Sequence, residues 1–207
     1  MRISHGELES CVRDPNAWVS ERRSGAPRFY SSGYDQILLL GIYRFHRTNV
    51  RQTGEVWIEA LFQRHAAKLT TVNRKEGVRE RYRGYTDWCG AVGLTVVERR
   101  VVLKGEFQAF LTLGGIVHRV DATANGVRGV IPGEYRSAWR LELRMPLIQL
   151  ALAGRYGIDR QDVSVGVQRL DGTGLSEATF DARRIANARR EFREMSEYVR
   201  QRYGIQP

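Results

Sequence analysis

The residues best placed to do chemistry are an acid and a base at alternate positions, Glu134 and Arg136. Alternate residues of a strand point to the same face, so this carboxylate and this guanidinium would lie side by side. The planar fork of a guanidinium matches phosphate oxygens, and the pair therefore indicates a face that meets a phosphate group. Arg144 follows on the next predicted helix and would add a further positive charge.

A hairpin and the helix after it must position these side chains. Segments 114–121 and 130–137 are separated by Asn125-Gly126, a turn whose two central residues tolerate positive φ. The helix predicted over 139–156 has leucine or isoleucine on most sides, which indicates burial against the sheet.

Strict alternation divides the first strand of this hairpin into two faces. One face would carry His118, and the other would carry Arg119 and Asp121. Asp121 would therefore point away from His118, unless a β-bulge flips the register between them.

This order of elements resembles the RecB-like branch of the PD-(D/E)XK nucleases, and is similar to the CRISPR-associated RecB-type exonucleases. In that family a strand ends in a metal-binding acid, a hairpin leads to an acid-x-Lys strand, and the next helix carries a Gln and a Tyr. His118 stands at the position of the metal-binding acid here. Glu134 and Arg136 stand at acid-x-Lys, and Arg144 and Ile148 at the two helix positions, so that Glu134 alone keeps the family residue.

The resemblance implies a catalytic set of Glu134, Arg136 and His118 that has degenerated. The family holds Mg²⁺ or Mn²⁺ between carboxylates, and an imidazole is a poor ligand for such hard cations. We therefore expect a protein that binds nucleic acid, DNA rather than RNA, as a binding or scaffolding subunit in DNA processing or defence. The alternative is an active metal-dependent DNA nuclease whose rearranged site holds the ion on Glu134 and Asp121. A third alternative is an unrelated α/β fold in which these are ordinary core and rim residues.

The N-terminal segment indicates whether the chain can hold an iron–sulfur cluster. Residues 4–7 (Ser-His-Gly-Glu) have the spacing of a capping box, which predicts a helix from Ser4 to about Trp18. In the CRISPR-associated members a cysteine after this helix helps to hold an iron–sulfur cluster, and Asp14 occupies that position here. The chain has two cysteines in all, so we expect no such cluster, and no cofactor unless an active site holds Mg²⁺ or Mn²⁺.

Arginine dominates the charge of this chain, whose formal net charge is +10. Such basicity favours phosphate partners over a merely solvated surface. The segment 73–83 is basic and is followed by Tyr85 and Trp88, an arrangement typical of a surface that tracks a backbone and stacks bases. The alternative for this segment is a solvated helix whose aromatic rings turn into the core. The predicted nucleic-acid-binding residues are Arg144, Arg74, Lys75, Arg79, Arg81, Arg83, Arg183, Arg184, Arg189 and Arg190.

The whole chain of 207 residues is predicted to be one α/β domain, with a central mixed sheet flanked by helices. Its expected parts are a mainly helical region over 1–93, a core sheet with one helix over 94–180, and a long basic helix over 181–203. Within the first part we expect a core helix over 34–46, with His46 at its surface, and an amphipathic helix over 54–68, with Trp57 turned inward.

Two expectations concern the cellular location of the protein and its binding partners. No signal peptide and no apolar run of membrane-spanning length is visible, so a cytoplasmic protein without membrane contact is expected. Besides nucleic acid, protein partners in a multi-subunit complex are expected.

Overall fold

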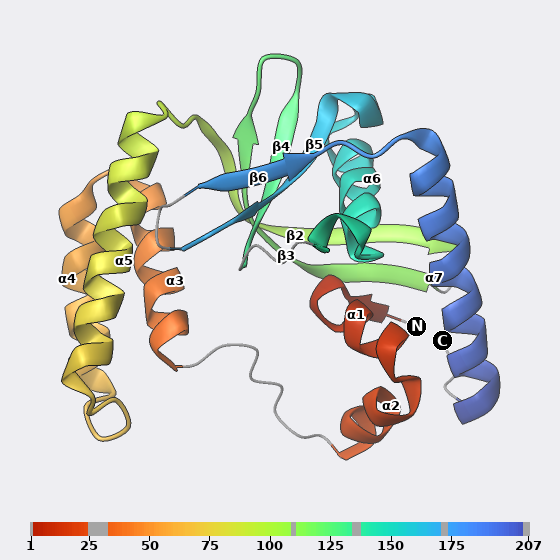
Figure 1. Cartoon of the computed structure of the whole chain (residues 1–207), viewed down its shortest axis with the longest axis horizontal. Coiled ribbons are helices and arrows are strands. Elements are labelled where there is room, and N and C mark those ends of the chain that lie inside the picture. Colours follow the sequence, from red (N-terminus) through yellow and green to blue (C-terminus); the bar gives the residue numbers. More distant parts are fainter. Residues whose placement is uncertain (1, 25–32, 109–110, 134–137, 171–173, 205–207) are drawn as a thin grey trace.

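The described part of the chain forms a six-stranded mixed β-sheet with helices on both sides (Figure 1). A computed structural model describes residues 2–24, 33–108, 111–133, 138–170 and 174–204. The strands are β1 (Arg2–Ser4), β2 (Val96–Gln108), β3 (Leu111–Ala122), β4 (Val127–Pro132), β5 (Val163–Gln168) and β6 (Leu175–Ala178). The α-helices are α1 (His5–Arg13), α2 (Pro15–Ser24), α3 (Gly33–Thr48), α4 (Arg51–Arg64), α5 (Val72–Ala91), α6 (Arg144–Tyr156) and α7 (Ala182–Tyr203). Short 3₁₀ helices are η1 (Trp139–Leu141) and η2 (Arg160–Asp162).

β3 organises the sheet. It pairs with β2 along almost its whole length, antiparallel, and its other edge is shared by β1 near its start and by β4 near its end. β4 then pairs with β5 in parallel, and β6 closes the sheet antiparallel to β5. The prediction of a mixed sheet with the second strand of the hairpin at its centre is confirmed, but this strand runs over Val127–Pro132 and not over 130–137, of which residues 134–137 lie outside the described part of the chain.

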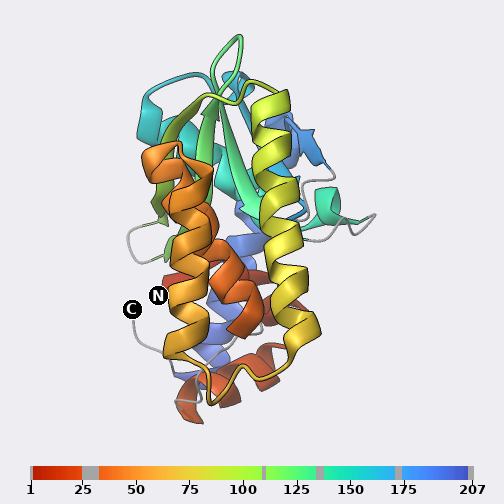
Figure 2. The same cartoon turned by 90° about the vertical axis from the view of Figure 1, so that its left-hand side faces the viewer.

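The helices form three groups, and each group packs around its own apolar cluster. α3, α4 and α5 pack together on one side of the sheet, and Figure 2 shows α4 and α5 in front of it. α6 covers the other side, where its apolar residues join those of β2 to β5 in one cluster. α1, α2 and α7 enclose a third cluster with the start of β3 and the first turn of α6.

The connection from β4 through α6 to β5 is the predicted strand–helix–strand crossover. α6 begins at Arg144, later than the predicted start at residue 139, and one turn of 3₁₀ helix precedes it. Pro146 is the third residue of α6, and the first turn of a helix tolerates proline because its N–H groups have no partner inside the helix.

The predicted capping box is present, since both the backbone N–H and the hydroxyl of Ser4 donate to the Glu7 carboxylate. The single helix expected from there to Trp18 is wrong, because α1 ends at Arg13 and α2 begins at Pro15. Proline has no N–H for an interior helical bond, and Asp14 caps the new helix by accepting from the Ala17 N–H at 3.0 Å.

The predicted alternation of faces along β3 is also wrong. Arg100 of β2 has a φ of 50°, a left-handed conformation that is uncommon for arginine, and the ladder passes from Arg99–Arg119 to Val101–Val117 without pairing Arg100 to His118. His118 then packs against α3 and Arg119 against α5, so two successive side chains reach the same helical layer. Asp121 lies on that side as well.

The C-terminal helix agrees with its predicted range and seam. Asp181 caps α7 by accepting from the Arg184 N–H at 2.7 Å, and Gly204 ends it in the left-handed conformation. In the parts of the chain that the structure describes, no helix combines the length and the apolarity that crossing a bilayer requires.

Candidate nucleic-acid interface

The predicted catalytic positions are only partly visible. Glu134 and Arg136 lie outside the described residues. His118 is 1% exposed, with its ring centroid 4.7 Å from that of Tyr43 and 6.4 Å from that of His46. Burial, together with the nearby Arg119 charge, lowers the pKa of His118 well below its ordinary value, so the ring is neutral at pH 7.

Asp121, the other predicted metal ligand, is fully buried between two guanidiniums. Arg119 Nε lies 2.7 Å from one carboxylate oxygen, and an Arg128 nitrogen lies 3.3 Å from the other. Both oxygens are thus engaged by positive groups that would repel a divalent cation. No set of three or more His, Cys, Asp or Glu side chains within the described ranges is placed to hold a metal ion.

His46 belongs to the same buried group, so its predicted surface position is wrong. His46 is 4% exposed, and its Nε2 lies 2.7 Å from the Tyr85 hydroxyl, which accepts a hydrogen bond from Arg119. Burial, reinforced by the charges of Arg119 and Arg99, lowers the pKa of His46 to about 3. The Tyr85 hydroxyl therefore connects the buried Arg119 of β3 to His46 of α3 through hydrogen bonds.

Three arginines in the basic segment of α5 pair with acids of the same helical layer. Arg79 makes two hydrogen bonds to Glu59, at 2.6 and 3.0 Å, and one to Glu76. Arg81 pairs with Asp35 at 2.9 Å, and Arg83 lies 3.7 Å from Glu55. Arg74 and Lys75 lie over the rings of Tyr34 and Phe62. Tyr82 and Tyr85 turn into the core, as in the alternative of a solvated helix.

Several of the other predicted arginines are also offset by acids. Arg144 pairs with Glu142 at 2.6 Å. On α7, Arg184 lies 3.8 Å from Glu191 and Arg190 lies 3.9 Å from Glu194. Arg183 and Arg189 are exposed on the same helix, and within the described residues no carboxylate pairs with either of them.

A different set of arginines surrounds an open pocket of about 380 Å³ between α3, α4 and β2. We call it the basic–aromatic pocket, and its lining residues are Leu40, Tyr43, Arg44, Arg47, Trp57, Arg99 and Arg100. The α3 members recur every three or four positions, a spacing that aligns side chains on one face of a helix. Trp57 is 36% exposed on α4, so the prediction that it turns inward is wrong.

The charges of the basic–aromatic pocket are not offset. All four of its arginines are exposed, and none of them pairs with a carboxylate in the described part of the chain. The guanidinium of Arg44 lies 5.7 Å from the Trp57 ring centroid, and that of Arg100 lies 5.2 Å from the Tyr43 centroid. Guanidinium groups held over aromatic rings keep their charge and their outward donors, which suits contact with phosphates.

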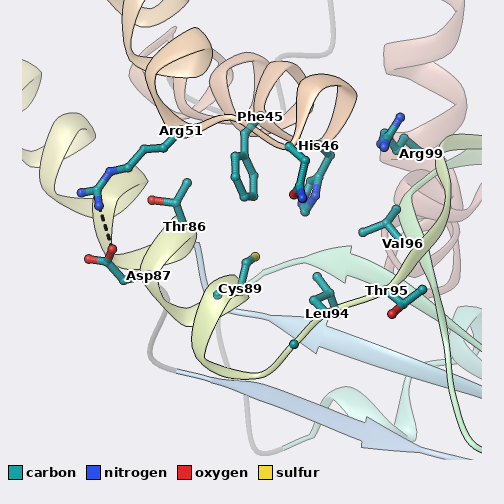
Figure 3. Close-up of a pocket in the computed structure, with 13 residues that line it drawn as sticks. Phe45, His46, Arg51, Thr86, Asp87, Cys89, Leu94, Thr95, Val96 and Arg99 are labelled. Atoms are coloured by element: carbon teal, nitrogen blue, oxygen red, sulfur yellow. Dashed lines mark hydrogen bonds and ion pairs between the residues drawn. The ribbon is translucent and has the colours of Figure 1, made fainter.

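A second hollow, the polar pocket, is drawn in Figure 3. It shares Arg99 with the basic–aromatic pocket. Its volume is about 630 Å³. Figure 3 shows the Arg51–Asp87 ion pair, of 2.7 Å, on one side of it and His46 beside Arg99 on the other. The lining residues are Phe45, His46, Asn49, Arg51, Thr86, Asp87, Cys89, Gly90, Gly93, Leu94, Thr95, Val96 and Arg99.

Neither the thiol nor the imidazole that lines the polar pocket is activated for catalysis. Burial raises the pKa of the Cys89 thiol to about 11, so the thiolate needed for nucleophilic attack is scarce at pH 7. His46, with its pKa of about 3, is too weak a base near neutrality. The described geometry therefore offers contacts for a bound molecule without an activated nucleophile or base.

Sequence reasoning missed the basic–aromatic pocket, although part of its signal was present. Arg44 and Arg47 are three positions apart on a predicted helix, and Arg99-Arg100 is a basic pair in a predicted strand. Their meeting depends on how α3 packs on β2. The positive charge of Arg79 on α5 is offset by Glu59 of α4, which is not a neighbour in sequence.

Comparison with known proteins adds no family to this geometry. Neither a scan against models of protein families nor a search of curated proteins finds a match to this chain.

Proposed function

We propose that this protein binds nucleic acid through the basic–aromatic pocket and does not cleave it. The observation that carries the proposal is the gathering of Arg44, Arg47, Arg99 and Arg100, without carboxylate partners among the described residues, around Tyr43 and Trp57. Cations that release counterions from phosphates supply the affinity, and aromatic rings add contacts with bases. The role of a binding or scaffolding subunit, with DNA as the expected polymer, belongs to the same proposal.

Membership of the RecB-like nucleases remains a proposal too. It is supported by the order of hairpin, α6 and parallel β5, which is the order that suggested the family. Absence of cleavage is supported by Asp121, whose oxygens are engaged by Arg119 and Arg128, and by His118, which is buried and neutral.

Binding is tested by fluorescence anisotropy with labelled single- and double-stranded DNA and RNA at low salt. The double variant Arg44→Gln/Arg47→Gln should bind about tenfold more weakly, because each removed charge forfeits counterion release. The comparison variant Arg183→Gln/Arg189→Gln removes the same charge from α7, whose arginines are also predicted contacts, and should weaken binding less. A loss confined to the comparison variant would move the interface to α7, and no binding of any polymer would refute the proposal.

Cleavage is tested with the same polymers in Mg²⁺ and then in Mn²⁺, and none of them should be degraded. Cleavage that disappears in both Asp121→Asn and Glu134→Ala would establish the alternative, a metal-dependent nuclease. Cleavage that survives both changes indicates a contaminating enzyme.

A further inference from the structure

The polar pocket opens beside the arginines of the proposed interface. Arg99 lines both hollows, so a polymer held by Arg44, Arg47 and Arg100 would lie next to the polar pocket. The volume of about 630 Å³ lies within the range of pockets that enclose small molecules, and it exceeds what a single nucleobase needs.

The inner lining of the polar pocket suits a base better than a phosphate. At the end of α5 the carbonyl oxygens of Trp88, Cys89 and Gly90 already accept backbone N–H groups, so side chains supply the remaining polar contacts of the lining. The Asp87 carboxylate disfavours an anion and can accept from the amino or imino group of a base. Asn49 and Thr95 add side chains that both donate and accept, and Phe45 and Leu94 add apolar surface.

An exposed arginine lies where the polar pocket meets the basic–aromatic pocket. Arg99 is exposed and has no carboxylate partner among the described residues, whereas Arg51, on the other side, is held by Asp87 at 2.7 Å. A nucleotide can therefore place its phosphate against Arg99 while its base enters the pocket.

From this arrangement we infer that the polar pocket receives the base of one unpaired nucleotide, whose phosphate Arg99 holds. The inference rests on the proposed nucleic-acid binding and adds a requirement for an unpaired base. A paired base inside a duplex cannot leave its stack without an energetic cost, so a blunt duplex would bind through the arginines alone.

Gly90 offers a way to fill this pocket. It lines the pocket near the end of α5, and a Cβ built there meets no heavy atom within 4 Å. Gly90→Phe should therefore fold and occupy the space of the base. Thr95→Phe fills the pocket from an exposed position on the other side. Gly77→Phe is the matched control, because Gly77 lies on the same helix, also has free space at its Cβ, and is not part of the pocket.

Two measurements test the inference. Saturation-transfer NMR with 5′-mononucleotides should show transfer to base protons for wild type and Gly77→Phe, and none for Gly90→Phe or Thr95→Phe. By anisotropy, both filled variants should bind a single strand about fivefold or more weakly, the effect of losing one base contact, and bind the blunt duplex like wild type.

Equal single-strand affinity of the filled variants and the control, or base-proton transfer that survives filling, would overturn the inference and leave the arginine interface intact. If wild type binds no polymer at low salt, the proposed function fails instead. The two failures are thus distinguishable.

Discussion

Asp121 and Arg119 form an ion pair in which both side chains have no solvent exposure. Neither charge would be tolerated there alone, because the interior solvates an isolated ion poorly. Arg119 also donates to Tyr85 and lies over the Trp88 ring, 5.6 Å from its centroid, so the guanidinium links the sheet to α5. The ion pair therefore has a structural role, which differs from metal binding.

Removing the carboxylate tests that role. Asp121→Ala leaves Arg119 buried without its partner and should lower the free energy of unfolding by about 3–5 kcal/mol. Asp87→Ala breaks an exposed ion pair and should cost about 0–1 kcal/mol. Urea unfolding followed by circular dichroism measures both. An unchanged midpoint for Asp121→Ala would contradict the structural role of this carboxylate.

His46 predicts a dependence of stability on pH. Its pKa is about 3 in the folded protein, against 6.5 as its ordinary value, so as the pH falls below 6.5 the unfolded chain takes up a proton that the folded chain does not. The free energy of unfolding therefore decreases with falling pH, by up to about 1.4 kcal/mol per pH unit for this group.

His46→Gln keeps an acceptor for Tyr85 and removes the titration. Between about pH 7 and pH 5 the free energy of unfolding should fall by about 2 kcal/mol less in this variant than in wild type. His118 and His5, whose pKa values are also lowered by burial, titrate equally in both proteins. Equal pH dependences would mean that His46 is protonated in the folded state.

At the scale of elements, α3, α4 and α5 meet at glycines. A Cβ on Gly54 would collide with the Tyr82 hydroxyl of α5 and lie 2.8 Å from the Gly41 carbonyl oxygen of α3. Tyr82 also donates to the Arg51 carbonyl at 2.8 Å, so its ring cannot move without loss of a hydrogen bond. The close approach of these helices positions Trp57 beside Arg44.

Replacing glycine by alanine should accordingly lower the stability of the protein at one helical site and raise it at another. Gly54→Ala should destabilise the protein by about 1–3 kcal/mol through overpacking. Gly77→Ala meets open space and should stabilise it by up to about 1 kcal/mol, because alanine favours helix more than glycine. Thermal unfolding of the two variants compares them, and stabilisation of both would mean that the helices are not tightly packed at Gly54.

The elements that sequence reasoning found are those specified by local patterns. Apolar periodicity placed α3, α6 and α7, and the Asn125-Gly126 turn placed the hairpin of β3 and β4. The irregular pairing at Arg100 was not predictable, because a left-handed arginine in a strand has no local signature. It lies opposite the part of β3 where His118 and Arg119 reach the same helical layer.

At the scale of the whole molecule, the distribution of charge matters more than its sum. The net charge of +10 correctly indicates a basic surface, but the acids Glu59, Glu76 and Asp35 offset the α5 arginines that seemed most suitable. Uncompensated arginines gather instead where α3 meets β2, a contact between segments far apart in sequence. Sequence reasoning could therefore predict a basic surface, and not which of its arginines lack acidic partners.

The salt dependence of binding is the most direct test of this interface. For a single strand, the slope of log affinity against log salt changes by about 0.7 for each phosphate contact. We therefore compare wild type with the fourfold variant Arg44→Gln/Arg47→Gln/Arg99→Gln/Arg100→Gln. The matched control is Arg183→Gln/Arg189→Gln/Arg193→Gln/Arg202→Gln, which removes four exposed arginines of α7.

The slope should become shallower by up to about 3 in the interface variant, because four guanidiniums no longer displace counterions. It should change less in the α7 variant. Equal slopes for wild type and the interface variant, or a flattened slope in the control alone, would contradict binding at the basic–aromatic pocket.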